Sequence, residues 1–526
     1  MAARILVADA LAEAGVEILR SEGQVTVQTG LAPERLLETI PDYEALVVRS
    51  ATRVTRDVLS AGRNLRVVAR AGVGVDNIDV EEATRRGIVV VNSAGGSTFA
   101  ATEHTFAVLL ALARNVPQAM QSLRQGEWTP GRFVGTELRG KTLGVVGLGR
   151  IGTQVARRAL AFEMRVLASD PFIAREHAES NGVELVPLET LLTESDVISL
   201  HAPLNPQSAD LMGSAEFERM KRGALLVNCA RGGLLDEAAL VKALDSGHLG
   251  GAALDVFQEE PSPHRALLEH PRVVVTPHLA ASSREAQQEV ATDVARLVLA
   301  CLRGEHVSGA VNAPLRVAGD IEFIEPYLRL AEKLGQAMIQ LTGARLETVD
   351  LTYAGELATH DVTPLTAAAI KGLLGPVTEQ RVNLINARLV ARSRGLNVRE
   401  QKAERPEENY ANLITVTVRE NLTQRVVAGT ILQDSPRIVR IDDYWVDVVP
   451  EGHVLLTHHL DRPGMIGRVG TLLGDGDVNI SAMQVGRRVL RGDAIMILNL
   501  DEPLAAELEA RIAAIPDVRS VKQVSL

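Results

Sequence analysis

Short apolar runs alternate with amphipathic stretches over the first 97 residues. Each run is three to five residues long and is rich in Val and Ile; the runs are Ile5–Ala8, Leu46–Val48, Leu65–Ala69 and Ile88–Val91. Short strands that are apolar throughout and are separated by helical patterns indicate a parallel sheet covered on both faces. We therefore expect the chain to begin with an α/β unit.

The strand–helix rhythm resumes after an apolar helix predicted over Ala101–Ala113 and a polar stretch that contains Gly126, Pro130 and Gly131. Six further strands are predicted, at Leu143–Val146, Arg165–Ala168, Val197–Leu200, Ala224–Val227, Ala252–Val256 and Val273–Thr276. Six strands in this order predict a Rossmann-type doubly wound parallel sheet. A helix over Arg284–Leu302 follows, and then a linker near Gly304–Pro314.

The chain from residue 316 onwards has a different pattern. Residues 316–450 mix apolar helical stretches with strand-like runs, which predicts an α+β segment; these are Leu328–Leu341, Leu365–Leu374, Leu413–Val418 and Arg425–Ile431. Residues 453–526 are predicted to run strand, helix, strand, strand, helix, strand. The second of these helices shows its apolar face at Leu504, Leu508, Ile512 and Ile515, which recur at three- or four-residue steps.

Composition excludes several classes of protein. Among 526 residues, 66 acidic and 55 basic side chains give a net charge of −11, so nothing indicates the basic face of a nucleic-acid binder. The two cysteines, Cys229 and Cys301, do not make a disulfide framework, and a reducing cytoplasm is the expected location. The first residues predict a strand rather than a signal peptide, and no apolar run reaches the ~20 residues that a membrane-spanning helix needs.

A glycine-rich turn follows the strand at Leu143–Val146. Gly147, Gly149 and Gly152 fit the pattern G-x-G-x-x-G, and a helix is predicted directly after them. Such a turn lets the backbone approach a pyrophosphate at a helix N-terminus. The next strand ends in Asp170, whose carboxylate is placed to bind ribose hydroxyls and to repel the 2′-phosphate of NADP. NAD is therefore the expected cofactor, and the alternatives are a turn without a ligand and an Asp170 that only begins a turn.

Three later segments stand where strands are predicted to end, the edge at which open α/β sheets bind ligands. Residues 227–233 contain Arg231, residues 253–261 contain Glu260, and residues 275–280 contain His278. At these residues, and over residues 1 to about 310, the chain resembles the D-isomer-specific 2-hydroxy-acid dehydrogenases. The resemblance implies that His278 is the general acid/base, that Glu260 is its partner, and that Arg231 binds the substrate carboxylate.

Each of these residues also has a plainer interpretation. Taken alone, Arg231 is a surface ion-pair partner, His278 a helix-capping residue and Glu260 a solvated turn residue, with Glu259 as a competitor for the role of Glu260. The family places its glutamate directly before proline, which favours Glu260. One departure from the family is Ala280, where many members have glycine.

Further cofactor contacts follow from the resemblance. His201 and Ala202 are expected beside the nicotinamide ribose, and Asp255 near the nicotinamide amide. Cys229 is interpreted as a small packing residue in the cofactor cleft rather than as a nucleophile. The remaining cofactor contacts are predicted at Arg150, Ile151 and Ala230.

The first unit is predicted to hold the substrate. The resemblance implies that backbone amides of the turn Gly72–Val73–Gly74 bind the substrate carboxylate. Arg49 and Arg53 follow the strand Leu46–Val48 with hydroxyl residues around them, which suits a phosphate group. A solvated basic loop is the alternative. Arg132 is a weaker candidate that reaches over from a neighbouring subunit.

The chain continues about 200 residues beyond the usual length of this family. Its end resembles an ACT domain, through residues 459–467 and 477–480. A dehydrogenase core followed by an intervening segment and an ACT end is the arrangement of long-form members, which oxidise 3-phosphoglycerate to 3-phosphohydroxypyruvate with NAD in the first step of L-serine biosynthesis. The resemblance thus implies feedback by L-serine as an effector bound by Asp461 and Asn479, and a homodimer or homotetramer without a metal.

The resemblance also names the predicted domains. A discontinuous, flavodoxin-like substrate-binding domain is expected over 1–97 and 283–310, and the Rossmann-type NAD-binding domain is expected to be inserted in it over 98–282. An intervening regulatory domain over 316–450 and an ACT regulatory domain over 453–526 complete the chain.

Two other functions stay open on the sequence. A glyoxylate or hydroxypyruvate reductase of the same family needs neither Arg49 nor Arg53 and leaves the tail unexplained. A non-enzymatic NAD-sensing scaffold can keep Arg231, Glu260 and His278, but the ACT end argues against it. The ACT end itself is either a serine site or a fold used only for assembly.

Overall fold

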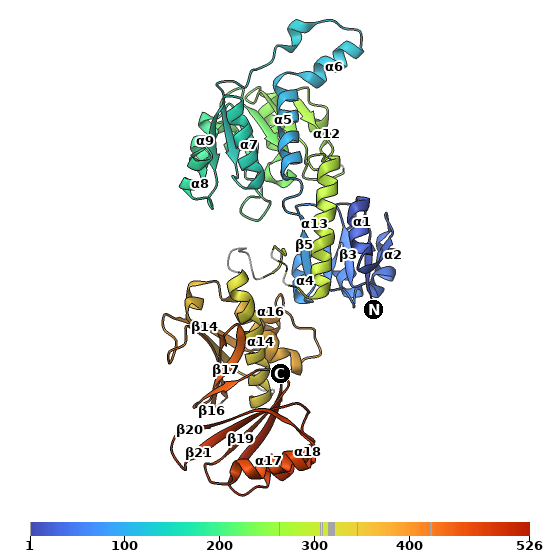
Figure 1. Ribbon diagram of the computed structural model, residues 1–526. Coiled ribbons are helices and arrows are strands. Elements are labelled where there is room, and N and C mark those ends of the chain that lie inside the picture. The colour runs from blue at the N-terminus through green and yellow to red at the C-terminus, as the bar shows by residue number, and fades with distance from the viewer. Residues whose placement is uncertain are drawn as a thin grey trace.

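The computed structural model describes residues 2–261, 263–305, 307, 309–313, 321–343, 346–420 and 423–526. It contains four sheets, of five, seven, six and four strands. The seven-stranded sheet lies at one end of an elongated molecule and the four-stranded sheet at the other, with the remaining two between them (Figure 1). The predicted α/β architecture with a separate α+β tail is confirmed.

The first sheet has the order β2-β1-β3-β4-β5 and all its pairs are parallel. Alternate residues of each strand enter two cores, one under α1 and α13 and the other under α2, α3 and α4. The strands are β1 Ala3–Val7, β2 Gly23–Val27, β3 Ala45–Val48, β4 Val67–Arg70 and β5 Val89–Asn92, and the helices are α1 Glu13–Arg20, α2 Pro33–Thr39, α3 Arg56–Ala61, α4 Val80–Arg85 and α13 Arg284–Arg303. The helix α13 thus returns from far along the chain to cover the first sheet (Figure 1).

The second sheet has the order β12-β11-β10-β9-β6-β7-β8 and is parallel throughout. Its strands are β6 Thr142–Val146, β7 Arg165–Ser169, β8 Glu184–Leu185, β9 Val197–Leu200, β10 Leu225–Asn228, β11 Gly251–Leu254 and β12 Val273–Val275. Its helices are α5 Thr98–Ala113, α6 Val116–Arg124, α7 Arg150–Ala161, α8 Arg175–Ser180, α9 Leu188–Glu194, α10 Ser214–Arg219, α11 Glu237–Asp245 and α12 Arg265–Leu268. All six predicted strands are present, and the chain order reverses between β6 and β9, where doubly wound sheets bind ligands.

The third sheet, β14-β13-β15-β16-β17-β18, is antiparallel except for the pair β13–β14. Its strands are β13 Thr348–Gly355, β14 Asn397–Ala403, β15 Asn412–Glu420, β16 Thr423–Leu432, β17 Ser435–Ile441 and β18 Tyr444–Val448, and its helices are α14 Ile321–Thr342, α15 Thr363–Leu374 and α16 Ala387–Ser393. The helix α14 packs on β16 and β17 and against α15. The predicted helices and strands of this segment all lie within these elements.

The fourth sheet, β20-β21-β19-β22, is antiparallel and carries two helices on one face. The elements are β19 His453–Leu460, α17 Met465–Asp475, β20 Ile480–Arg487, β21 Asp493–Leu500, α18 Ala506–Ala513 and β22 Val518–Ser525, in the predicted order. Leu455, Met496 and Leu498 face the helices, whereas Leu456, Ile495 and other residues of the opposite face join the core of the third sheet. The third and fourth sheets therefore share one apolar core.

Candidate active site

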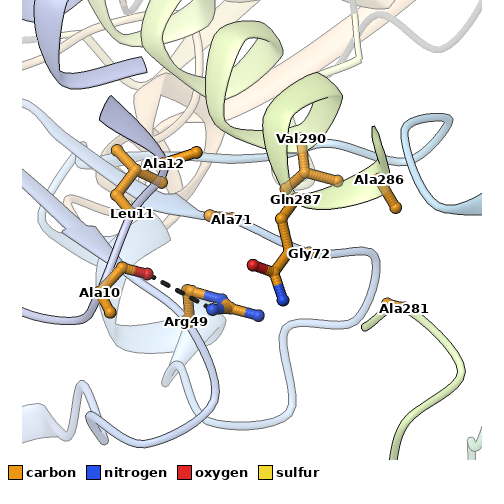
Figure 2. Close-up of a pocket in the computed structure, with 10 residues that line it drawn as sticks. All are labelled: Ala10, Leu11, Ala12, Arg49, Ala71, Gly72, Ala281, Ala286, Gln287 and Val290. Carbon is orange, nitrogen blue, oxygen red and sulfur yellow. Dashed lines mark hydrogen bonds between the residues drawn. The ribbon is translucent and has the colours of Figure 1, made fainter. Parts of the chain in front are cut away.

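Loops from the two parallel sheets meet at one cleft. Arg231, which follows β10 in the second sheet, forms an ion pair with Asp76, which follows β4 in the first; Nε and Oδ2 are 3.1 Å apart. Beside this contact, on the first sheet, a cavity of about 160 Å³ opens between the ends of its strands and the start of α13. Figure 2 shows the side chains of Arg49 and Gln287 pointing into this space from opposite sides.

His278 and Glu260 form a hydrogen-bonded pair, with 2.8 Å between Nδ1 and Oε2. The other oxygen of Glu260 accepts a hydrogen bond from the backbone N–H of Phe257 at 3.1 Å, which fixes the carboxylate. Within the described part of the chain no group is bonded to Nε2 of His278, and 43% of that side chain is exposed. A substrate can therefore reach Nε2. Glu260, rather than the exposed Glu259, is the glutamate that contacts the histidine.

Asp255 lies fully buried beneath this histidine and organises its loop. One carboxylate oxygen accepts from the N–H of Leu279 at 2.7 Å and lies 3.2 Å from His104 Nε2, and the other accepts from the N–H of Ala280 at 2.9 Å. Burial acts to raise the pKa of Asp255, but hydrogen bonds led by those from His104 and Thr276 outweigh it and lower the pKa. His104, which lies on α5, is not indicated by any sequence motif.

The guanidinium groups of Arg49, Arg70 and Arg231 lie near one another, the first two at strand ends of the first sheet and the third on a loop of the second. The Arg70 Nη1 donates to the carbonyl of Gly74, and burial, followed by the charges of Arg231 and Arg49 among others, lowers the pKa of Arg70. Gly74 belongs to the predicted carboxylate-binding turn; a Cβ there would lie 2.0 Å from Nη2 of Arg231. The turn can therefore approach Arg231 only because it lacks a side chain.

The loop that carries Arg49 is fixed by two buried or partly buried polar residues. Asp9 accepts from the Arg49 N–H at 2.6 Å and from the Thr52 hydroxyl at 2.8 Å. Asn77 Nδ2 donates to the Arg49 carbonyl at 2.7 Å. Arg53, the other predicted phosphate ligand, is exposed and does not line the cavity.

The glycine turn has the geometry that a dinucleotide needs. Gly147 has φ +91°, and a Cβ on Gly152 would lie 2.0 Å from the Gly147 carbonyl oxygen. A Cβ on Gly149 would meet nothing within 4 Å, so this position is open towards the N-terminus of α7. Asp170 accepts from the Leu148 N–H at 2.9 Å and therefore lies directly beside the turn. These residues fit a bound NAD.

Two titratable residues near the turn are held uncharged. Burial lowers the pKa of His201 to about 4, and its Nε2 lies 2.8 Å from the Ser199 hydroxyl. Burial, and then the charge of Asp255, raises the pKa of Cys229 to about 12. A thiol that stays protonated at neutral pH fits the predicted packing role of Cys229.

The two predicted effector residues lie apart within one chain. Asp461, after β19, contacts Arg487 Nη1 at 3.1 Å, and Asn479, before β20, donates to Asp501 at 2.6 Å. In the sheet register Leu460 pairs with Asp493, whereas Ile480 pairs with Leu500 at the other end of β21. Seven steps along a strand separate the two residues by roughly 24 Å. A pocket that uses both therefore needs a second chain.

Known proteins match the chain along its length. The family model described as "D-isomer specific 2-hydroxyacid dehydrogenase, NAD binding domain" matches residues 106–280. The models for the D-3-phosphoglycerate dehydrogenase intervening domain and the ACT domain match residues 323–442 and 453–517. The D-3-phosphoglycerate dehydrogenase of Methanocaldococcus jannaschii is 45% identical over 524 residues, which are 99% of this chain and 100% of that protein.

The chain belongs to the D-3-phosphoglycerate dehydrogenase family. The member from Bacillus subtilis is 41% identical and covers 99% of both chains. The chain accordingly has the NAD-binding domain of the 2-hydroxyacid dehydrogenases, and the α+β tail consists of the family's intervening and ACT domains.

Solved structures match the dehydrogenase part of this family member. The TT0316 protein from Thermus thermophilus has a TM-score of 0.55 and 38% identity, over 59% of this chain and 99% of its own. The D-lactate dehydrogenase from Aquifex aeolicus, complexed with NAD and lactic acid, has a TM-score of 0.52 and 28% identity, over 57% of this chain and 96% of its own. In the described residues, no helix is long and apolar enough to cross a membrane.

Proposed function

We propose that this protein oxidises 3-phosphoglycerate to 3-phosphohydroxypyruvate with NAD. The observation that supports it is a group of three neighbouring arginines, Arg49, Arg70 and Arg231, in a chain that also carries the hydrogen-bonded pair of His278 and Glu260. The substrate carries a carboxylate and a phosphate monoester, and the phosphate alone has a charge of about −1.5 to −2 at neutral pH. The three guanidinium groups together balance the charges of the phosphate and the carboxylate.

His278 takes the hydroxyl proton of the substrate. Its Nδ1–H donates to Glu260, so Nε2 carries the lone pair and accepts the proton from the C2 hydroxyl. The carboxylate of Glu260 stabilises the imidazolium that forms. When bound, NAD supplies the acceptor for the hydride that leaves C2 as the proton leaves the oxygen.

Arg231 binds the substrate carboxylate and polarises the oxygen on C2. Its present partner, Asp76, is 61% exposed in its side chain, so a substrate carboxylate can replace that carboxylate at the guanidinium. The amides of Gly72, Val73 and Gly74 lie on the same turn as Asp76 and complete the carboxylate site.

The cavity that Arg49 lines receives the phosphate. It lies on the first-sheet side of the cleft, with Gln287 across from Arg49, as Figure 2 shows. Asp9 and Asn77 fix the backbone of Arg49 but leave its guanidinium directed into the cavity. Arg53 is kept as a second, peripheral phosphate ligand at the exposed end of the same loop.

The proposal is tested by following absorbance at 340 nm with purified protein. Phosphohydroxypyruvate with NADH, and 3-phosphoglycerate with NAD, are expected to turn over at least 100-fold more efficiently than glyoxylate or hydroxypyruvate. Equal or better turnover of glyoxylate indicates the sibling reductase. Cofactor binding without any turnover indicates the NAD-sensing scaffold.

Regulation by L-serine is proposed for the ACT domain, between two copies of the chain. Asp461 supplies a carboxylate for the serine ammonium, and the N-terminus of α17 supplies amides for its carboxylate. Asn479 of a second copy reaches the same pocket when two fourth sheets pair. Arg487 already contacts Asp461, so serine must displace that contact.

Serine regulation is tested by rates measured with and without millimolar L-serine, in the wild type and in Asp461→Ala. Inhibition of the wild type that is lost in the variant supports the site. Inhibition that Asp461→Ala leaves unchanged places serine elsewhere, and a wild type that serine does not inhibit makes the ACT domain an assembly unit.

We further propose a homodimer through the segment around α6. Its large apolar side chains are exposed in the single chain, among them Met120, Leu123, Trp128 and Val134. Exposed apolar patches of this kind indicate an interface. Arg132 belongs to this segment, where it pairs with Glu127 at 3.0 Å. Sedimentation of the chain as a monomer at micromolar concentration would contradict this assembly.

A further inference from the structure

A second cavity lies at the opposite end of the first sheet from the active cleft. It has a volume of about 550 Å³ and lies where β1, β3 and β4 begin. Four arginines and two carboxylates line it: Arg4, Arg63, Arg66, Arg381, Asp42 and Glu44. Three of the arginines belong to the first sheet and its loops, whereas Arg381 comes from the intervening domain.

Positive charge in this cavity is not balanced. Arg66 and Glu44 are 3.5 Å apart, and Arg4 and Asp42 are also 3.5 Å apart, so each acid has one loose partner. In the described residues neither Arg63 nor Arg381 has a carboxylate within ion-pair distance. Partial burial, and then the nearby charge of Arg66, lower the pKa of Arg381 and outweigh the opposite effect of the Glu44 charge. Two guanidinium charges therefore remain for a ligand.

The contact between the two domains holds Arg381 in place. Asn383 Nδ2 donates to the Gly87 carbonyl at 2.6 Å, and Gln380 Nε2 donates to the Arg85 carbonyl at 3.2 Å. These neighbours of Arg381 join the loop before α16 to the turn between α4 and β5. In Figure 1, α16 lies close to α4. Arg381 is thus brought up to Arg66 rather than left to move away from it.

We propose that this cavity binds a phosphate group, as a free ion or as a small phosphate monoester, between the first sheet and the intervening domain. A dianion matches the two unbalanced charges, and guanidinium groups bind phosphate oxygens in a bidentate manner. The ligand bridges Arg381 to Arg63 and Arg66, which otherwise repel one another, and so strengthens the contact between the two domains.

The cavity and the active cleft lie at the two ends of the same strands. Glu44 precedes β3 and Arg49 follows it, and Arg66 precedes β4, which ends at Arg70. Strands of four residues place the two sites roughly 15 Å apart. A phosphate bound at one end is therefore not the phosphate of a substrate bound at the other.

Calorimetric titration of the full-length chain tests the proposal. The active cleft is first disabled as an anion site by Arg49→Gln with Arg231→Gln. Inorganic phosphate and glycerol 3-phosphate are then titrated separately. The probe with the lower dissociation constant identifies the free ion or the monoester as the preferred ligand. One site per chain is expected for at least one of these probes.

Adding Arg63→Gln with Arg381→Gln is expected to weaken that binding at least tenfold. The matched control, Arg222→Gln with Arg392→Gln, removes two other exposed arginines that form no ion pair with a described residue, and it should leave the affinity within twofold. Thermal unfolding of each variant without ligand verifies that it folds. No binding of either probe, or equal binding in the Arg63/Arg381 variant and its control, would overturn the proposal.

Discussion

His278 has a left-handed backbone, with φ +56°, which non-glycine residues adopt at some cost in free energy. Its N–H donates to the Asp255 carbonyl at 2.9 Å, and the next two amides donate to the Asp255 carboxylate. A buried aspartate thus holds the loop in the conformation that turns the imidazole to Glu260. The position of the His278 ring is therefore determined in part by a side chain that solvent does not reach.

Substitution of His278 by Asn is predicted to lower kcat by roughly 10²–10⁴-fold, the usual contribution of general acid/base catalysis. Asn also adopts left-handed backbone, so the loop should survive. The Kd for NAD, from quenching of protein fluorescence, should change less than threefold. His264→Asn, at an exposed histidine directly before α12, is the control and should keep kcat. Normal kcat in His278→Asn removes this residue from the mechanism.

Asp170 is predicted to set the preference for NAD over NADP. Its carboxylate lies at the glycine turn, where it would repel a 2′-phosphate. Asp170→Ala should raise the ratio of kcat/KM for NADP to that for NAD at least tenfold. Because the change also removes the bond to the Leu148 N–H, both values can fall; the ratio separates discrimination from general damage. A wild type that prefers NADP contradicts this role.

Residue-scale prediction from sequence succeeded where a motif is local. The three glycines, Asp170 and the strand-end positions of Arg231, Glu260 and His278 are recognisable within a few residues of each other or of a strand. His104 is not recognisable from the sequence, because its partner Asp255 is 151 positions away and a lone histidine on an apolar helix has no distinguishing pattern. Asp9 contacts Arg49 only after β1 and β3 pair.

At the scale of elements, α14 and α15 pack unusually closely through glycines. A Cβ on Gly335 would lie 2.1 Å from the Ala369 carbonyl oxygen, and one on Gly372 would lie 2.0 Å from that of Glu332. Side chains at these positions would push the two helix backbones apart. The pair forms much of the core shared by the intervening and ACT domains.

Gly335→Ala is predicted to lower the free energy of unfolding of the tail by about 1–3 kcal/mol, the usual cost of overpacking, despite the better helix propensity of alanine. Gly470→Ala is the control, because a Cβ there meets nothing within 4 Å on α17. It should be neutral or stabilise by up to about 1 kcal/mol. Urea unfolding followed by circular dichroism measures the stability of both variants. Equal unfolding midpoints for Gly335→Ala and Gly470→Ala would contradict this packing.

Elements were predictable where burial makes the pattern strong. The central strands of both parallel sheets are apolar runs, and each was expected within about two residues of its observed place. The edge strand β2, Gly23–Val27, was missed because only its two valines are apolar, and β8 because it has two residues. Edge strands bury less surface, so their sequences vary more freely.

At the scale of the whole molecule, the proposed function depends on loops at the carboxyl ends of two sheets meeting, as Arg231 and Asp76 do. No pattern within either half predicts that Arg231 contacts the turn at Asp76, 155 positions away; the family resemblance implies only that Arg231 and this turn bind the same substrate carboxylate. The ACT domain shows the converse. Asp461 and Asn479 are 18 positions apart in sequence, yet the antiparallel register places them at opposite ends of the sheet.

The central claim is that the first sheet recognises a phosphate while the second carries out the chemistry. The direct test is the ratio of kcat/KM for phosphohydroxypyruvate to that for hydroxypyruvate, in the wild type and in Arg49→Gln. A lost charged hydrogen bond costs about 1.5–3 kcal/mol, so the ratio should fall roughly 10–150-fold, with kcat/KM for hydroxypyruvate nearly unchanged. Arg53→Gln, at the exposed end of the loop, should lower this ratio less than Arg49→Gln does. A ratio that Arg49→Gln leaves at the wild-type value would contradict the account.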